Sequence, residues 1–513
     1  MFYKLKMAVI ARTTLVAVIV AIGVTPALAA IDVTSMAMRV FYSARGQAPV
    51  WADDRHYDSL LAALRGLSQH GLDPRDYHID DLIRLRNDPI GRDRIATAAW
   101  FDAASDMVWG KLEPQKYQPD WTLSRQVFDL PSHLTEALAQ NRVGDSLTRL
   151  APDRRDYQAL RAELSRLMSM NPEPIQRIPR GSLIGPHSTD YRVVIVRARL
   201  VQLGYLAENT GSQLYDQDLK SAVVAFQTAK GLNPDGLIGS STIAALNLTL
   251  ADKIDQLRVN LERLRWLPSD LGRRHVIVNI AGYEVSAVEN GQVVSTHAAI
   301  VGRYTRKTPV FSDRIQYLVF NPWWETPAKL ARLDKLPMFQ EDPSQVKKLG
   351  FRVLDRQNRP VDPDLIDWST ISADAFPYRL RQEPGRRNAL GQVKIMFPNK
   401  HAVYLHDTPD RELFSKQNRA ISSGCVRTED ALGLSEWLLS ETPGWTSERI
   451  ARAVASGKVT TASLAEPVPV HLLYHTTTID DYGNVQYLDD VYGRDGAVLA
   501  GLRAPPPELR AQN

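Results

Sequence analysis

The chain has 513 residues, more than a single hydrophobic core usually serves, so roughly two to four domains are expected. Hydrophobic residues make up 44% and charged residues 23%, as in ordinary globular proteins. The formal net charge of +4 is small for this length, so the chain lacks the excess of basic residues that nucleic-acid binding needs. We therefore exclude nucleic acid as a partner.

The first 29 residues have the features of a secretory signal peptide. Basic residues precede an apolar run from Leu15 to Val24, and the small residues Ala27-Leu28-Ala29 follow it. A membrane anchor is the alternative, but a helix needs about 20 apolar residues to cross a bilayer core, and this run is shorter. We therefore predict a signal peptide over residues 1–29, export to the periplasm and no stable membrane span.

Residues 30–188 are predicted to form a helical N-terminal domain. Apolar residues recur at helical spacing in His56–Gln69 and in Ile95–Lys111. Proline, glycine and arginine are frequent between Asn171 and Thr189, which is typical of a linker.

Residues 189–248 are predicted to form a small three-helix domain. Leu203-Gly204-Tyr205, Phe226-Gln227 and Asp235-Gly236 give it a pattern that resembles the peptidoglycan-binding domain of cell-wall enzymes. Glycines, aromatic residues and polar turn residues agree together here, not only the apolar rhythm. A helical spacer without a ligand site is the alternative. Residues 249–272 are predicted to form a connecting helix.

From residue 273 the pattern changes to short runs rich in β-branched and aromatic residues, which indicate strands. We predict a mainly β domain over residues 273–445. A charged insertion of helical character, at about residues 326–386, is too long for a plain loop and could form a lid. Residues 446–513 are predicted to be a C-terminal extension that packs on the other domains. The predicted strands are His275–Ile280, Val285–Val288, Gln292–Val301, Ile315–Phe320, Val393–Phe397 and Val403–Leu405.

Cys425 is the only cysteine of the chain. Structural cysteines pair in an oxidising compartment, and a lone thiol has no partner within its own chain. Such a thiol is either retained for chemistry or is an inert buried residue, and composition alone leaves both interpretations open.

The surroundings of Cys425 favour chemistry. His406 ends a predicted strand, and Ser422-Ser423-Gly424-Cys425 precedes a predicted helix from Thr428 to Leu439. A nearby imidazole or helix N-terminus can stabilise a thiolate. The turn before the cysteine can expose the sulfur and aim backbone N–H groups at a developing oxyanion. We therefore predict acyl transfer, with Cys425 as nucleophile and His406 as base.

These residues resemble the motif of the L,D-transpeptidases with a YkuD-type catalytic domain. Ser423 stands where many members carry a second histidine, but the long periplasmic members also show Ser-Ser-Gly-Cys-Val-Arg. Those members have a scaffold region, a peptidoglycan-binding insert and a lid, so the resemblance implies a scaffold at residues 30–188 and a β-sandwich with a helical lid at residues 273–445. The matching positions are His406, Ser422, Gly424 to Arg427, Gly302, Thr308-Pro309, Asn321 to Trp324, Asn388 to Gly391 and Val491 to Asp495.

The resemblance implies a specific reaction. The Cys425 thiolate would attack the diaminopimelate carbonyl of a donor tetrapeptide stem and release D-Ala, leaving a thioester. The side-chain amine of an acceptor diaminopimelate would then resolve it, giving a direct cross-link. Carbapenems would acylate the same cysteine, no cofactor would be needed, and partners would include stem peptides and enzymes that build or trim the wall.

Other residues near the site have two interpretations each. Arg427 could bind a substrate carboxylate or tie down the loop by an ion pair. Tyr404 and Trp324 could wall the substrate groove or belong to the core, and Asn388 is expected at the substrate through the family motif. Asp407 is not expected to orient His406, because neighbours on a strand point to opposite faces. A metal site is not expected, since the 11 histidines show no paired ligand spacing and no second cysteine exists.

Three other functions remain open. Water could resolve the thioester, which would make the protein an L,D-carboxypeptidase or an endopeptidase. The acceptor could be a lipoprotein lysine, so that the enzyme attaches a lipoprotein to peptidoglycan. In a different class, the chain could be a wall-binding scaffold without activity, although an intact Cys425 and His406 disfavour this.

Overall fold

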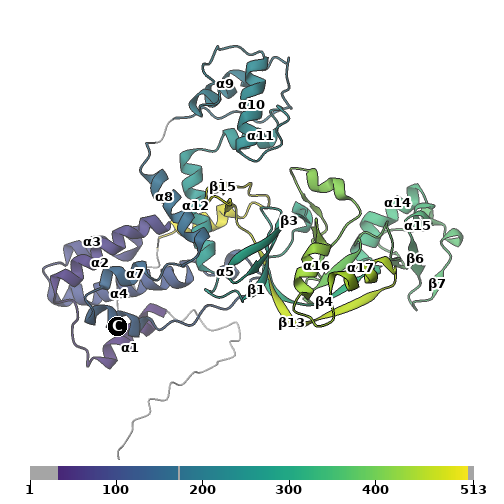
Figure 1. The fold of residues 1–513 in the computed structure, drawn as a ribbon. Coiled ribbons are helices and arrows are strands. Elements are labelled where there is room, and N and C mark those ends of the chain that lie inside the picture. Colours follow the sequence, from purple (N-terminus) through teal and green to yellow (C-terminus); the bar gives the residue numbers. More distant parts are fainter. Residues whose placement is uncertain (1–32, 172–173, 506–513) are drawn as a thin grey trace, which may run out of the picture.

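The computed structural model describes residues 33–171 and 174–505, so the predicted signal peptide lies outside the described residues. A helical part, a small helical unit and a mainly β part follow one another along the chain (Figure 1). Within the described ranges, no helix has the length and apolar character needed to cross a bilayer.

The N-terminal region is helical, as predicted, and has its own core. In the long helix α4, the alanines Ala96, Ala99 and Ala103 are fully buried and let neighbouring helices approach closely. Pro89 and the capping carboxylate of Asp88 start this helix. The helices are α1 (Val33–Ala44), α2 (Asp54–Gly66), α3 (Ile79–Arg84), α4 (Pro89–Trp109), α5 (Pro114–Tyr117), α6 (Leu130–Ala139), α7 (Val143–Thr148) and α8 (Arg155–Met168).

The small helical unit extends away from the rest of the molecule, with a separate core (Figure 1). Val196, Val223 and Phe226 are fully buried in this core. The unit contains α9 (Arg192–Gln202), α10 (Gln217–Ala229) and α11 (Ser240–Leu246).

Helix α12 (Leu250–Arg265) joins the parts of the molecule. A capping box between Thr249 and Asp252 starts the helix. Near its other end Glu262 and Arg265 form a fully buried ion pair at 2.6 Å. Glu262 also accepts the backbone N–H of Leu112, and Arg265 donates to the carbonyl of His70, so the pair links α12 to the N-terminal region.

The β part is built on one sheet that closes on itself, in the order β11-β3-β12-β10-β9-β4-β13-β1-β2, with β2 also paired to β3. This single closed sheet replaces the predicted sandwich, because β3 is long enough to pair with β2 at one end and with β12 at the other. The strands are β1 (Arg274–Asn279), β2 (Glu284–Glu289), β3 (Gln292–Gly302), β4 (Phe311–Phe320), β9 (Val393–Met396), β10 (Leu405–His406), β11 (Ala420–Ser422), β12 (Val426–Thr428) and β13 (Thr460–Leu473), and the helices α16 (Ala431–Leu439) and α17 (Ser447–Ala455) come after β12.

The insertion in the β part contains helices, as the sequence predicted, but it is a small domain that also has its own sheet. Phe351, Val353 and Leu380 alternate with exposed residues along two strands and are buried in a separate core. This alternation forms a four-stranded sheet in the order β5-β8-β6-β7. Its elements are β5 (Trp324–Glu325), α13 (Ala328–Leu330), α14 (Leu336–Glu341), α15 (Gln345–Lys348), β6 (Phe351–Leu354), β7 (Pro360–Val361) and β8 (Arg379–Gln382).

The β domain was predicted to end at residue 445, which is wrong because β13 (Thr460–Leu473) lies beyond that residue. This strand pairs with β4 on one side and with β1 on the other, so it lies inside the main sheet. The C-terminal extension therefore begins only after Leu473, the last residue of β13. In this extension β14 (Thr477–Ile479), β15 (Val485–Tyr487) and α18 (Asp495–Arg503) pack on α8 and α12.

Candidate active site

Three neighbouring strands place Cys425 and His406 on the same face of the main sheet. His406 in β10 lies opposite Lys394 in β9 and opposite Arg427 in β12. Directly opposed residues share a face, and Cys425 lies two positions before Arg427, so its side chain emerges on that face too. The sheet thereby brings together a thiol, an imidazole and two cationic side chains.

The turn before Cys425 is held by hydrogen bonds within the turn and by hydrogen bonds from Thr308 and Arg306. Ser422 donates through Oγ to the carbonyl of Cys425 at 2.6 Å and accepts the N–H of Gly424 at 3.1 Å. Gly424 has a φ of 120°, which a side chain would disfavour. Thr308 donates to the Gly424 carbonyl at 2.8 Å. Ser423 accepts a hydrogen bond from Arg306 at 2.9 Å, and Ser423 therefore takes part through its side chain as well.

The helix predicted to begin at Thr428 begins later, at Ala431. Val426 to Thr428 form β12, which lies between β3 and β10 and whose first and last side chains are buried. Burial of these β-branched residues outweighs local helix propensity. The helix therefore begins six residues after Cys425, instead of the three that the sequence predicted.

A backbone carbonyl orients His406. The Nδ1 atom lies 2.5 Å from the carbonyl oxygen of Asp407. A carbonyl only accepts, so Nδ1 carries the proton and Nε2 is left as the acceptor. Burial and the Arg427 charge lower the pKa of His406 to about 3, so the ring is neutral at neutral pH. A neutral imidazole in this tautomer can receive a proton through Nε2.

The carboxylate of Asp407 has a structural role. It accepts the backbone N–H of Gln392 at 2.8 Å and an N–H of Arg411 at 2.5 Å. As the sequence predicted, this carboxylate does not orient the imidazole. It instead fixes the backbone of Asp407, whose carbonyl oxygen orients the imidazole.

Substitution Gly391→Ala should destabilise the protein next to this carboxylate. Gly391 has a φ of 60°, and an added Cβ would lie 2.3 Å from a carboxylate oxygen of Asp407. Left-handed strain and this clash together should lower the free energy of unfolding by about 2–4 kcal/mol in chemical denaturation. Gly457→Ala is the control: its φ is 65° and nothing lies within 4 Å of its Cβ, so a loss of about 1 kcal/mol is expected. Equal losses in both variants would contradict the proposed clash.

Cys425 rests as a thiol in these surroundings. Burial raises its pKa, while hydrogen bonds from Tyr404 and the charges of Lys394 and Arg427 act in the opposite direction. The Sγ atom donates a long contact of 3.8 Å to the carbonyl of Ala402. With a neutral thiol and a neutral imidazole on one face of the sheet, attack by the sulfur would require the proton to move to the imidazole, which is general-base chemistry.

The pH dependence of thiol alkylation tests this resting state. With a raised pKa, the rate of reaction of Cys425 with iodoacetamide should rise about tenfold per pH unit from pH 6 to pH 8, because only the thiolate reacts. A mass spectrometric time course at each pH measures this rate. A flat profile across this range would instead indicate a preformed thiolate–imidazolium pair.

The predicted substrate-binding residues differ in their position and in their contacts. Arg427 pairs with Asp410 at 3.1 Å, which corresponds to the loop-tying alternative. Trp324 is buried in the core of the insertion. Tyr404 packs against that core and the core of the main sheet, and its ring lies 5.6 Å from that of His406. Asn388 is almost fully buried and bonds the carbonyls of Pro322 and Glu383, so its expected contact with substrate is not supported.

Two residues near the turn were missed. Lys394 lies 4.0 Å from the ring centroid of Tyr404, and its burial lowers its pKa. Arg306 joins Ser423 to Asp334 of the insertion. A lysine inside an otherwise apolar strand was the available signal for Lys394, while nothing in the sequence near Cys425 points to Arg306.

Family models match three parts of the chain. A scaffold domain matches residues 36–164, a "Putative peptidoglycan binding domain" residues 189–246, and an L,D-transpeptidase catalytic domain residues 273–457. A Haemophilus influenzae protein named "Putative L,D-transpeptidase" is 40% identical over 240 residues, which are 47% of this chain and 48% of that protein. The chain thus covers about half the length of this relative.

Several solved structures similar to the chain are L,D-transpeptidases by title. One from Mycobacterium smegmatis is 12% identical, with 39% of this chain and 58% of that chain covered and a TM-score of 0.18. Another, from Xylanimonas cellulosilytica, is 17% identical, with 59% and 100% covered and a TM-score of 0.17.

Proposed function

Since the chain belongs to the L,D-transpeptidases through a YkuD-type catalytic domain at residues 273–457, we propose that it cross-links peptidoglycan stem peptides through a thioester on Cys425. The observation that carries this proposal is the placement of Cys425 and His406 on one face of the sheet, with the imidazole oriented by the Asp407 carbonyl. The domain at residues 189–246 would hold the enzyme on the wall.

The reaction has two halves. In the first, His406 Nε2 takes the thiol proton as Sγ attacks the diaminopimelate carbonyl of a tetrapeptide stem. The amide C–N bond then breaks, and His406 returns the proton to the leaving amine of D-Ala. In the second, the amine of an acceptor diaminopimelate attacks the thioester and loses its proton to His406. The C–S bond breaks, and His406 returns that proton to the departing sulfur, which restores the Cys425 thiol and the neutral imidazole.

The negative charge that develops on the carbonyl oxygen during the attack is stabilised by hydrogen-bond donors that are already in place. The N–H of Cys425 lies directly after a turn fixed by Ser422 and Gly424, which makes it a suitable oxyanion donor. Lys394 and Arg427 add positive charge on the same face, and their charges also favour the thiolate. The turn residues therefore act through the backbone they hold.

The product of the second half distinguishes the alternatives. We expect the full chain, incubated with disaccharide tetrapeptide, to release D-Ala and to form a dimer lighter than two substrates by one D-Ala, measured by mass spectrometry. Tripeptide without dimer would instead support the L,D-carboxypeptidase alternative. Loss of preformed cross-links would support an endopeptidase, and transfer to a lysine peptide would support lipoprotein attachment.

The proposed setting is the periplasm, after removal of the signal peptide predicted at residues 1–29. Enzymes that trim pentapeptide stems to tetrapeptides would supply the donor. Carbapenems would acylate Cys425, because their β-lactam ring is a strained amide that a thiolate opens. A wall-binding scaffold without activity is disfavoured, because both Cys425 and His406 are present and suitably arranged.

A further inference from the structure

Lys394 is a half-buried cation on the catalytic face without an acidic partner. It lies opposite His406 in the sheet, and its Nζ atom lies 4.0 Å from the centroid of the Tyr404 ring. Among the residues that the structure describes, no carboxylate forms an ion pair with Lys394 and no group accepts a hydrogen bond from it. The carboxylate of Glu325 pairs with Arg381 at 2.9 Å instead. Burial of a charge is costly unless the charge is paired, so an ammonium group in this position is suited to receive an anion.

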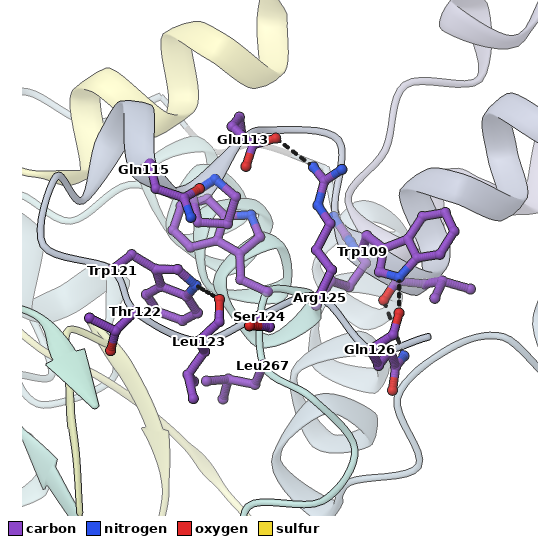
Figure 2. A pocket seen from close by; sticks show the side chains of 14 residues that line it. Trp109, Glu113, Gln115, Trp121, Thr122, Leu123, Ser124, Arg125, Gln126 and Leu267 are labelled. Carbon is purple, nitrogen blue, oxygen red and sulfur yellow. Dashed lines mark hydrogen bonds and ion pairs between the residues drawn. The ribbon is translucent and has the colours of Figure 1, made fainter. Parts of the chain in front are cut away.

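Two other cations differ from Lys394 in that each has an acidic partner. Arg427, on the same face of the sheet, pairs with Asp410 at 3.1 Å. Arg125 lines a cavity of about 140 Å³ between α4 and the end of α12, and it pairs with Glu113 at 2.8 Å (Figure 2). Both arginine charges are therefore offset within the protein, whereas the charge of Lys394 is not.

The Tyr404 side chain connects Lys394 to the nucleophile. Its hydroxyl group forms a hydrogen bond with Cys425, while the ammonium group of Lys394 lies over its ring. The charge of Lys394 acts to lower the pKa of the Cys425 thiol, and a charge on Cys425 acts to raise the pKa of Lys394. Such an effect requires that the two groups be close in space. The ammonium group therefore lies beside the position from which Sγ attacks.

The donor of the proposed reaction carries a carboxylate close to the bond that breaks. In a tetrapeptide stem, the D-Ala carboxylate carbon is three bonds from the attacked carbonyl carbon, which places it within about 4 Å of that carbon. The side-chain carboxylate of diaminopimelate is twice as many bonds away. When Sγ reaches the carbonyl, the D-Ala carboxylate is therefore the anion of the donor nearest to the reacting atoms.

We propose that Lys394 binds the terminal D-Ala carboxylate of the donor stem and thereby determines which stems acylate Cys425. The identity of this ligand rests on the proposed function, which supplies the tetrapeptide donor. A tetrapeptide forms a charge-assisted hydrogen bond between its carboxylate and the ammonium group. A stem extended by one residue carries an amide at this position and leaves the Lys394 charge unpaired. A site that loses such a partner rejects the ligand.

The test compares three donors on the full chain: disaccharide tetrapeptide, the same compound ending in D-alaninamide, and a form amidated at the side-chain carboxylate of diaminopimelate. Release of D-Ala or D-alaninamide, measured by mass spectrometry, gives kcat/KM for acylation. We expect the wild type to prefer the tetrapeptide over the D-alaninamide donor about 10- to 100-fold, the usual effect of a hydrogen bond to a charged group. With the third donor, which keeps the D-Ala carboxylate, the reaction should depend on Lys394 as it does with the tetrapeptide.

Substitutions of lysine assign this preference. Lys394→Met keeps a side chain of similar length without the charge, so it should lower kcat/KM for the tetrapeptide about 10- to 100-fold and leave that for the D-alaninamide donor within about threefold. Lys394→Arg retains a cation that pairs with carboxylates and should keep most of the preference. Lys400→Met is the control, because Lys400 is exposed and faces Asp120 at 3.8 Å, and it should behave as the wild type. The ratio between two donors on one variant does not depend on the folded fraction.

An equal loss with both donors in Lys394→Met would overturn the proposal, since a cation that only stabilises the thiolate gives that result. A loss that depends on the diaminopimelate side-chain carboxylate instead would also overturn it. A preference for the D-Ala carboxylate without dimer formation counts against the proposed cross-linking alone, while dimer formation without the preference counts against Lys394 alone. If no donor reacts, calorimetry of the same donors with Cys425→Ala decides, and equal affinities for the tetrapeptide and the D-alaninamide donor would exclude the role of Lys394.

Discussion

Replacement of Cys425 by alanine is expected to lower cross-linking of disaccharide tetrapeptide by at least about 10⁴-fold. No other residue of the chain can form the thioester, since the sequence contains no second cysteine. Loss of a nucleophile removes the covalent route entirely, and the remaining rate reflects positioning of the two stems. Initial rates of dimer formation by mass spectrometry measure the effect.

The fold should survive this substitution. Cys425 is partly exposed, and its Sγ has a long contact of 3.8 Å with the Ala402 carbonyl and a hydrogen bond with Tyr404, so the melting temperature should change little. A thioester adduct with tetrapeptide minus D-Ala should be trapped on the wild type and be missing from the variant. Dimer formation at the wild-type rate by Cys425→Ala would refute the proposed mechanism.

Replacement of His406 by glutamine is expected to lower the rate of acylation about 10²- to 10⁴-fold, the usual contribution of a general base. Glutamine keeps a polar side chain of similar size but cannot carry the thiol proton. Because His406 is neutral down to a pH of about 3, the wild-type loss at low pH should not track an imidazole titration near pH 6.5. Single-turnover acylation by tetrapeptide gives the rate.

His401→Gln provides the matched control. This histidine is also close in sequence to the site, but its ring packs on Phe311 and it faces Asp120 at 3.5 Å. We expect its acylation rate to stay within about threefold of the wild type. If His401→Gln and His406→Gln lost activity equally, the assignment of His406 as base would fail.

Local patterns were sufficient for much of the fold. Helical spacing located α2 and α4, and runs of β-branched residues located β1, β3 and β9. The spacing of His406 and Cys425, with Ser422 and Gly424, placed the candidate site. The helix and strand signals each lie within one element, and the site residues lie within the short stretch 406–425.

Other features of the fold and the site depended on contacts between distant segments. Lys394 joins the site only through the register of β9 against β10, and Arg306 reaches Ser423 across 117 residues. The closure of the sheet depends on β2 pairing with β3 while β13 fills the gap between β4 and β1. The insertion gained a sheet because its strands bury Phe351 and Leu380 against one another. Pairings of this kind leave no trace in a single stretch of sequence.

The position of β13 constrains when the main sheet can close during synthesis of the chain. A nascent chain that has emerged only as far as the end of α17 already carries Cys425 and His406, yet β4 and β1 each still present an open edge to solvent. The barrel can be sealed only when β13 arrives, after every other strand of the main sheet has been made. Cys425 and His406 therefore lie in a closed sheet only after nearly all of residues 273–473 have been made.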